Sequence, residues 1–190
     1  MKGIEMIRFS LVAAAATAGV AAPASAQQEA APFSGPRVEA VAGISEEVFV
    51  GGGVGYDVQK GRLVFGVEGE VTTSLEKDCE VLMSNIQDRL CLKLGRDLYA
   101  GGRVGFALGS STLLYAKAGY SNLRLKDSYD PGTGGGSGFE FTRDLDGVRV
   151  GAGIEQKLGR SAYVKGEWRY SNYENDNYKH DGLIGVGFRF

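Results

Sequence analysis

The feature that most constrains the fold is an alternation of apolar and polar residues in eight separate segments of the 190-residue chain. In each segment, one of the two alternating sets contains no charged residue, as in the run from Val48 to Val58. Successive side chains of a β-strand point to opposite faces, so each segment is predicted to be a strand with one uncharged face. The eight segments run near 37–44, 48–58, 63–71, 98–108, 113–120, 147–155, 162–170 and 182–190.

The opposite face of these predicted strands carries seven basic and six acidic residues, separated by small residues that are mostly glycine. The thirteen are Arg37, Glu39, Asp57, Glu68, Glu70, Arg103, Lys117, Arg149, Glu155, Lys165, Glu167, Arg169 and Arg189. Because unpaired charges are costly in a narrow, partly dehydrated space, charges of both signs on one face predict ion pairs. We expect these pairs among Glu39, Glu68, Glu70, Arg103, Lys117, Arg149, Glu155, Lys165, Glu167 and Arg169.

Alternation alone fits a soluble barrel with its apolar face inside or a membrane barrel with its apolar face toward lipid. The glycine-rich charged face and the aromatic residues at both strand ends favour the membrane barrel. Tight connections at 59–62, 109–112 and 156–161 also alternate with long ones at 72–97, 121–146 and 171–181. We therefore predict an all-β fold, an eight-stranded antiparallel transmembrane β-barrel in an up-and-down meander, with the long loops outside.

The composition agrees with this prediction and excludes some functions. The chain has 30 Gly but only 4 Pro, together with 9 Tyr and 9 Phe, which suits many strands better than helices or a disordered chain. Its formal net charge of −2 gives no reason to expect nucleic-acid binding.

The N-terminal region reads as an export signal. Lys2 and Arg8 precede an apolar segment, and Ala24-Ser25-Ala26 provides the small residues of a cleavage site. The predicted organisation is a signal peptide at 1–26, a periplasmic tether at 27–36 and the barrel at 37–190.

Export also bears on the two cysteines, Cys79 and Cys91, which lie in one predicted outer loop. An isolated pair in an exported chain favours a disulfide, which would stabilise the fold by about 3 kcal/mol in the chain-entropy model. Free thiols or a metal site are the alternatives. Two cysteines with one distant histidine do not make a zinc site.

The predicted hairpins resemble a known family. The segments from Arg103 to Ala107 and from Leu113 to Tyr120 resemble the middle hairpin of small alphaproteobacterial outer-membrane proteins. Those proteins belong to the opacity-protein and OmpA-like β-barrel superfamily, which is often called the porin family. Residues 150–155 with 165–170 resemble the next hairpin, and residues 185–190 the last strand. The resemblance implies the outer membrane of a Gram-negative bacterium, an assembly signal at Phe188 and Phe190, and as partners the barrel-assembly machinery, outer-membrane lipid and lipopolysaccharide.

No residue pattern points to catalysis, a cofactor or a metal. His180 is the only histidine, and although Ser171 and Asp181 are near it in sequence, we interpret it as a solvated loop residue. We expect a non-enzymatic structural or surface-interaction protein with a lumen filled by ion pairs. Loops 72–97 and 121–146 are its candidate contacts with an extracellular or host ligand. The alternatives are a narrow pore for small solutes, a lipid-modifying barrel enzyme and a soluble ligand-binding barrel.

Overall fold

The computed structural model describes residues 31–45, 47–75, 78–81, 89–130, 138–174 and 177–190. All of its regular elements are strands, and no helix in these ranges is long and apolar enough to cross a membrane. The strands are β1 (Gly35–Ile44), β2 (Val48–Lys60), β3 (Leu63–Ser74), β4 (Asp78–Val81), β5 (Arg89–Leu108), β6 (Thr112–Asp130), β7 (Phe139–Leu158), β8 (Ala162–Tyr173) and β9 (Asn177–Arg189).

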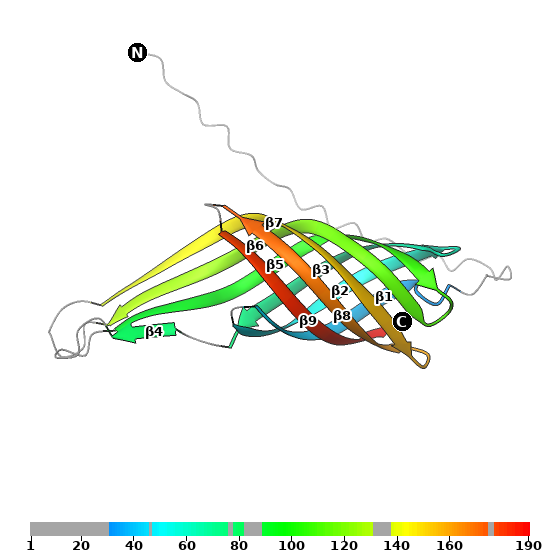
Figure 1. Ribbon diagram of the computed structural model, residues 1–190, viewed down its shortest axis with the longest axis horizontal. Coiled ribbons are helices and arrows are strands. Elements are labelled where there is room, and N and C mark those ends of the chain that lie inside the picture. The colour runs from blue at the N-terminus through cyan, green and yellow to red at the C-terminus, as the bar shows by residue number, and fades with distance from the viewer. Residues whose placement is uncertain (1–30, 46, 76–77, 82–88, 131–137, 175–176) are drawn as a thin grey trace, which may run out of the picture.

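Eight of these strands form a closed antiparallel barrel, as predicted. Each pairs with its neighbours in the chain, β9 pairs with β1, and β3 pairs with β5. The short strand β4 pairs only with the far end of β5, outside the ring (Figure 1). The barrel is therefore an up-and-down meander to which β4 adds an outlying edge.

The alternation in the sequence corresponds to the outside and the inside of this barrel. Apolar residues of the uncharged face are exposed, among them Val54 at 61% and Ile184 at 71%, whereas Arg149 and Glu155 of the charged face are fully buried. Aromatic residues of the outer face lie near both ends of the barrel. They are Tyr56, Phe65, Phe106 and Phe188 near one end and Tyr120, Trp168 and Tyr178 near the other.

Three tight turns lie at one end of the barrel, which we name the turn end. They follow β2, β5 and β7, and each contains a glycine with positive φ: Gly61 (59°), Gly109 (77°) and Gly159 (76°). A left-handed backbone conformation is easily adopted only by glycine, so these residues fix the hairpins locally.

At the opposite end, β5, β6 and β7 continue well beyond the other strands and form a sheet that β4 joins (Figure 1). We name this sheet the extension: β4 with residues 89–96, 124–130 and 139–145. The predicted loops 72–97 and 121–146 are therefore largely strand, which corrects the sequence-based interpretation. Alternation continues into part of this sheet, as at Leu123 and Leu125, but it is broken where the charged residues Arg143 and Asp144 follow each other and are both exposed.

Candidate functional site

The lumen holds a network of ion pairs that joins eight basic and eight acidic side chains. All ten residues predicted for lumen pairs belong to it. Arg37, Asp57 and Arg189, which the alternation also put on the charged face, belong to it as well. The balance of signs satisfies the requirement that charges removed from water be paired.

Near the turn end, Asp57 is the centre of the network. Its carboxylate accepts hydrogen bonds from Arg37 Nε at 3.1 Å, Arg103 Nε at 2.9 Å and Nη2 at 2.6 Å, and Arg189 Nη1 at 2.5 Å. Glu155 accepts from Arg103 at 3.2 Å and from Arg189 at 2.7 Å. A side chain at Gly66 would overlap the Asp57 carboxylate, so the glycine opposite makes this cluster possible.

In the middle of the barrel, lysines bridge glutamates from different strands. Lys117 Nζ lies 2.8 Å from both Glu68 Oε1 and Glu167 Oε1, and Lys165 Nζ lies 2.7 Å from Glu39 Oε1. Tyrosine hydroxyls complete the layer: Tyr115 donates to Glu167 and Tyr163 to Glu39. Their rings lie where side chains at the inward-facing Gly153 and Gly187 would stand, which explains the many glycines on the charged face.

Near the extension end, the network includes residues of the segments 72–97 and 171–181, which the sequence predicts to be loops. Arg149 donates to Asp97, Ser171 and the Tyr173 hydroxyl, and Arg169 pairs with Glu70 and with Asp181 at 3.0 Å. Lys179 lies 3.3 Å from Asp181 and 3.7 Å from Asp97.

Asp97, Lys179 and Asp181 were missed because the predicted strands began at 98 and 182. The alternation could have found them. Asp97 is two residues from the buried Tyr99, and Asp181 is two residues from the buried Leu183. Because side chains two residues apart share a face of a strand, beginning the predicted strands at 97 and 179 puts Asp97, Lys179 and Asp181 on the inward face.

Apolar clusters close both ends of the charged lumen. At the turn end, Phe33, Val64, Ala107 and Leu113 are buried against one another. At the extension end, Leu123, Leu145 and Tyr173 form a second cluster with Leu125 beside it, and Val41, Phe49 and Leu183 form a third. The lumen of the described barrel is thus a packed interior.

The segment before β1 forms part of the turn-end closure. The Phe33 carbonyl accepts from Arg189 Nη1 at 2.9 Å, its amide donates to Gln59 Oε1 at 3.0 Å, and the Pro32 carbonyl accepts from Lys157 at 2.7 Å. β1 begins at Gly35, so the last residues of the predicted tether 27–36 are built into the barrel. Residues 27–30 and the predicted signal at 1–26 lie outside the described residues.

Polar contacts on the outward side of β6 and β7 mark the base of the extension. Arg124 donates to both oxygens of Asp144, at 2.7 and 2.8 Å, and these hydrogen bonds lower the pKa of that carboxyl. Asp146 accepts from the Tyr120 hydroxyl and from Asn122 at 2.7 Å, and these bonds lower its pKa. The side chains of Cys79 and Cys91 are not among those described, although their backbones face each other in the register of β4 and β5.

His180 lies apart from the two polar residues that are close to it in sequence. Its ring packs against Tyr170 at 4.9 Å, Trp168 at 5.7 Å and Tyr178 at 6.2 Å between ring centroids. Ser171 and Asp181 instead point into the lumen, where they bind Arg149 and Arg169. The strand places the histidine and the other two residues on opposite faces, so they form no catalytic triad.

Comparison with known proteins agrees with this architecture. Residues 12–190 match the family model described as "Outer membrane protein beta-barrel domain". The chain belongs to this family. It is an integral β-barrel of a Gram-negative outer membrane.

Two relatives from alphaproteobacteria illustrate the family. The chain is 30% identical over 148 residues to the 25 kDa outer-membrane immunogenic protein of Brucella canis, covering 72% of this chain and 62% of that protein. It is 27% identical over 160 residues to the 22 kDa outer membrane protein of Rhizobium leguminosarum bv. viciae, covering 78% of this chain and 67% of that protein. The chain thus spans less than two thirds of the Brucella relative.

Solved structures share the fold at low identity. The N-terminal β-barrel domain of Pseudomonas aeruginosa OprF has a TM-score of 0.55 at 14% identity, covering 83% of this chain and 98% of that one. Yersinia pestis Ail, solved with the heparin analogue sucrose octasulfate, has a TM-score of 0.55 at 13% identity, covering 83% of this chain and 100% of that one. At such identities the likeness establishes the barrel fold alone.

Proposed function

We propose that this protein is a non-conducting barrel that uses the extension as an interaction surface outside the cell. The observation that carries the proposal is the combination of a closed, ion-paired lumen with three strands that continue past the barrel. In outer-membrane barrels, short turns face the periplasm and the longer connections face outward. The turn end is accordingly periplasmic and the extension end extracellular.

The filled lumen argues against the rival function, a narrow pore. Eight strands enclose a space just wide enough for side chains, and here buried Arg, Lys, Asp and Glu residues occupy it between apolar clusters. We expect no steady conductance when the purified protein is inserted into planar bilayers in potassium chloride. Long-lived single-channel steps from the wild-type protein would establish a pore and overturn this part of the proposal.

The extension is suited to binding because its backbone is already ordered in strands. A ligand that binds it does not have to order a flexible loop, which lowers the entropy cost of association. Exposed side chains such as Phe141 (59%) and Arg143 offer apolar and charged contacts. The proposed ligand is extracellular, on a host or in the environment.

A trimmed variant tests the role of the extension. Residues 76–95 and 124–144 are each replaced by a short glycine-containing turn, which keeps Leu123 opposite Leu145. Cells displaying the full or the trimmed chain are compared for retention on immobilised heparin and on cultured epithelial cells. Heparin is the first probe because the similar barrel of Ail was solved with a heparin analogue. If trimming leaves retention on both surfaces unchanged in cells with equal amounts of folded barrel, the extension is not the interaction surface.

A disulfide between Cys79 and Cys91 is part of the proposal, since it would clamp β4 to the extension. Directly opposed residues of antiparallel strands have Cα atoms about 4.5–5.5 Å apart, which is within the range that a disulfide bridges. The register of β4 and β5 makes these two cysteines directly opposed. The oxidising compartment outside the inner membrane, reached through the predicted signal at 1–26, favours the bond.

We further propose that the barrel has no lipid-modifying activity. The position of His180 supports this, because the residue packs among aromatic rings on the outer face, away from Ser171 and Asp181. Mass analysis of lipid A from cells with and without the protein is expected to give identical spectra. A mass difference that depends on the protein would show that it is an enzyme.

A further inference from the structure

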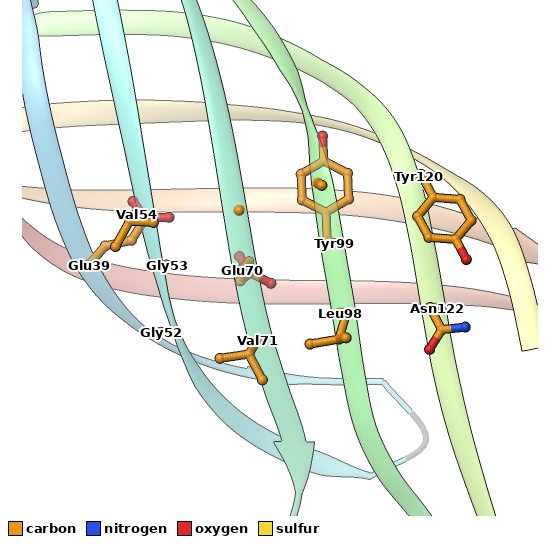
Figure 2. Close-up of a pocket in the computed structure, with 12 residues that line it drawn as sticks. Glu39, Gly52, Gly53, Val54, Glu70, Val71, Leu98, Tyr99, Tyr120 and Asn122 are labelled. Carbon is orange, nitrogen blue, oxygen red and sulfur yellow. The ribbon is translucent and has the colours of Figure 1, made fainter. Parts of the chain in front are cut away.

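A groove of about 820 Å³ is hollowed into the wall of the barrel over β2, β3, β5 and β6 (Figure 2). Its volume is within the range of about 300–1,000 Å³ typical of small-molecule sites. Side chains of the uncharged outer face border it, among them Val54, Val71 and Leu98, together with parts of Glu39, Glu70 and Tyr99, which belong to the inward face. The groove therefore opens toward the lipid.

Small residues on the outer face create this groove. Gly69 lies directly opposite Ala100 in the register of β3 and β5, and Gly52 lies diagonally from Gly69, opposite Val71, in the register of β2 and β3. A side chain would fit at Gly69, since a Cβ there would lie 3.7 Å from the nearest atom, the Tyr99 carbonyl oxygen. The barrel wall does not require a glycine at this position for backbone packing.

Basic residues stand directly above the groove, toward the extension end. Arg96 follows the outward face of β5 two residues beyond Leu98, and Arg124 and Lys126 follow that of β6 beyond Asn122. Arg124 is engaged by Asp144. Arg96 and Lys126 are exposed, and no carboxylate whose side chain is described lies within ion-pair distance of either, although Arg96 also attracts the Asp144 carboxylate.

We propose that the groove and these two cations form a specific site for an outer-leaflet lipid whose headgroup carries phosphate. One acyl chain fills the groove along Gly52, Gly69 and Ala100, and the phosphate lies between Arg96 and Lys126. Every lipid-facing hollow contains hydrocarbon, but this one ends where the apolar face gives way to unpaired positive charge. That junction matches the junction of acyl chain and headgroup in a lipid. The inference rests on the proposed orientation, with the extension end facing outward.

The charges near the site favour an anion by a modest margin. Arg96, Arg124 and Lys126 stand near the carboxylates of Asp144 and Asp146. Asp146 is already hydrogen-bonded by Tyr120 and Asn122, and Asp144 by Arg124. A basic residue near an anionic lipid surface contributes about a fivefold gain in affinity. Loss of both free cations is then expected to weaken binding about 25-fold.

The test uses the full chain refolded in lipid-free detergent, with bisphosphorylated lipid A as the probe and native mass spectrometry as the readout. Gly69→Leu fills the groove. Its matched control is Gly166→Leu on β8, another outward-facing glycine, where a Cβ would meet nothing within 4 Å. The headgroup is tested with Arg96→Gln combined with Lys126→Gln. The matched control pairs Arg62→Gln with Arg160→Gln, at exposed basic residues of the turn end.

We expect one tightly bound lipid A per wild-type barrel, binding at least tenfold weaker in Gly69→Leu, and unchanged binding in both controls. Lipid A stripped of its phosphates should bind the wild type as weakly as intact lipid A binds the double variant. Equal binding by Gly69→Leu and Gly166→Leu, or indifference to phosphate, would overturn the site. A dimer that dissociates on Gly69→Leu would show that the groove holds a second copy instead. All these variants keep the extension, so their results are independent of the trimming experiment.

Discussion

Replacement of Asp57 by asparagine tests the lumen network where it is most concentrated. The substitution preserves the size of the side chain and removes one negative charge at a fully buried position. Four hydrogen bonds from Arg37, Arg103 and Arg189 then lose their charged acceptor. The lumen acquires one uncompensated positive charge among three neighbouring guanidinium groups.

The size of the stability loss depends on which ion-pair partners each arginine retains. Removal of one partner from a fully buried ion pair costs about 3–5 kcal/mol. Here Arg103 and Arg189 keep Glu155, and Arg37 keeps Glu39 and Glu68. We therefore expect a loss at the lower end, about 3 kcal/mol in the free energy of unfolding, or roughly a hundredfold in the folding equilibrium constant.

The assay is equilibrium urea unfolding of the refolded protein in lipid vesicles. The chain has one tryptophan, Trp168, which lies 53% exposed on the outer face and reports on transfer out of lipid by its fluorescence. The matched control is Asp144→Asn in the exposed pair with Arg124, where we expect no measurable change. Adding Arg189→Gln to Asp57→Asn restores the charge balance and should recover part of the stability. If the substitutions at Asp57 and Asp144 had equal effects, the lumen would be well hydrated and the reasoning would be wrong.

Three further predictions concern the ends of the barrel and the extension. Phe33→Ala removes a fully buried ring from the turn end and should lower the free energy of unfolding by about 3–5 kcal/mol in the same urea titration. Phe141→Ala in the extension should have little effect. Equal losses in the two variants would show that the turn-end cluster does not stabilise the barrel. Deletion of Phe190 should reduce the membrane-inserted fraction in cells and leave aggregates in the periplasm, and normal insertion would argue against an assembly signal there. The unreduced protein should resist alkylation and have a mass lower than that of the reduced form by two hydrogens, and free thiols in freshly isolated protein would exclude the Cys79–Cys91 bond.

The barrel itself could be predicted from the sequence because two different environments act on the two faces of every strand. Lipid excludes charge from positions such as Val54 and Ile184, while the narrow lumen accepts Arg149 and Glu155 only in pairs. A charge-free face in eight segments carries that information without any knowledge of contacts. The inward position of the ten predicted charged residues follows from the same alternation.

Pairing within the lumen could not be predicted, because partners come from different strands whose stagger the sequence does not reveal. Arg169 reaches Glu70 across the barrel, and Tyr163 reaches Glu39. The extension was missed for a different reason. Its strands keep part of the alternation, as at Leu123 and Leu125, but consecutive charges such as Arg143 and Asp144 interrupt it. Phe33 leaves no periodic signal, because this member of the closing cluster precedes the alternating segments.

The meeting of the two ends of the described barrel has a consequence for engineering. The Phe190 amide donates to the Pro36 carbonyl at 2.9 Å, and a side chain at Gly35 would overlap the Phe190 carbonyl. The first and last strands, β1 and β9, are joined by the same kind of backbone hydrogen bonds as any other two neighbouring strands of the barrel. A short linker from Phe190 to Ala31 would therefore allow circular permutation of the protein refolded in detergent, where no assembly signal is needed, with new termini opened between β8 and β9. In such a protein the Phe33 segment would lie in an internal loop. Its role in closing the barrel would then be separated from its position near the start of the chain.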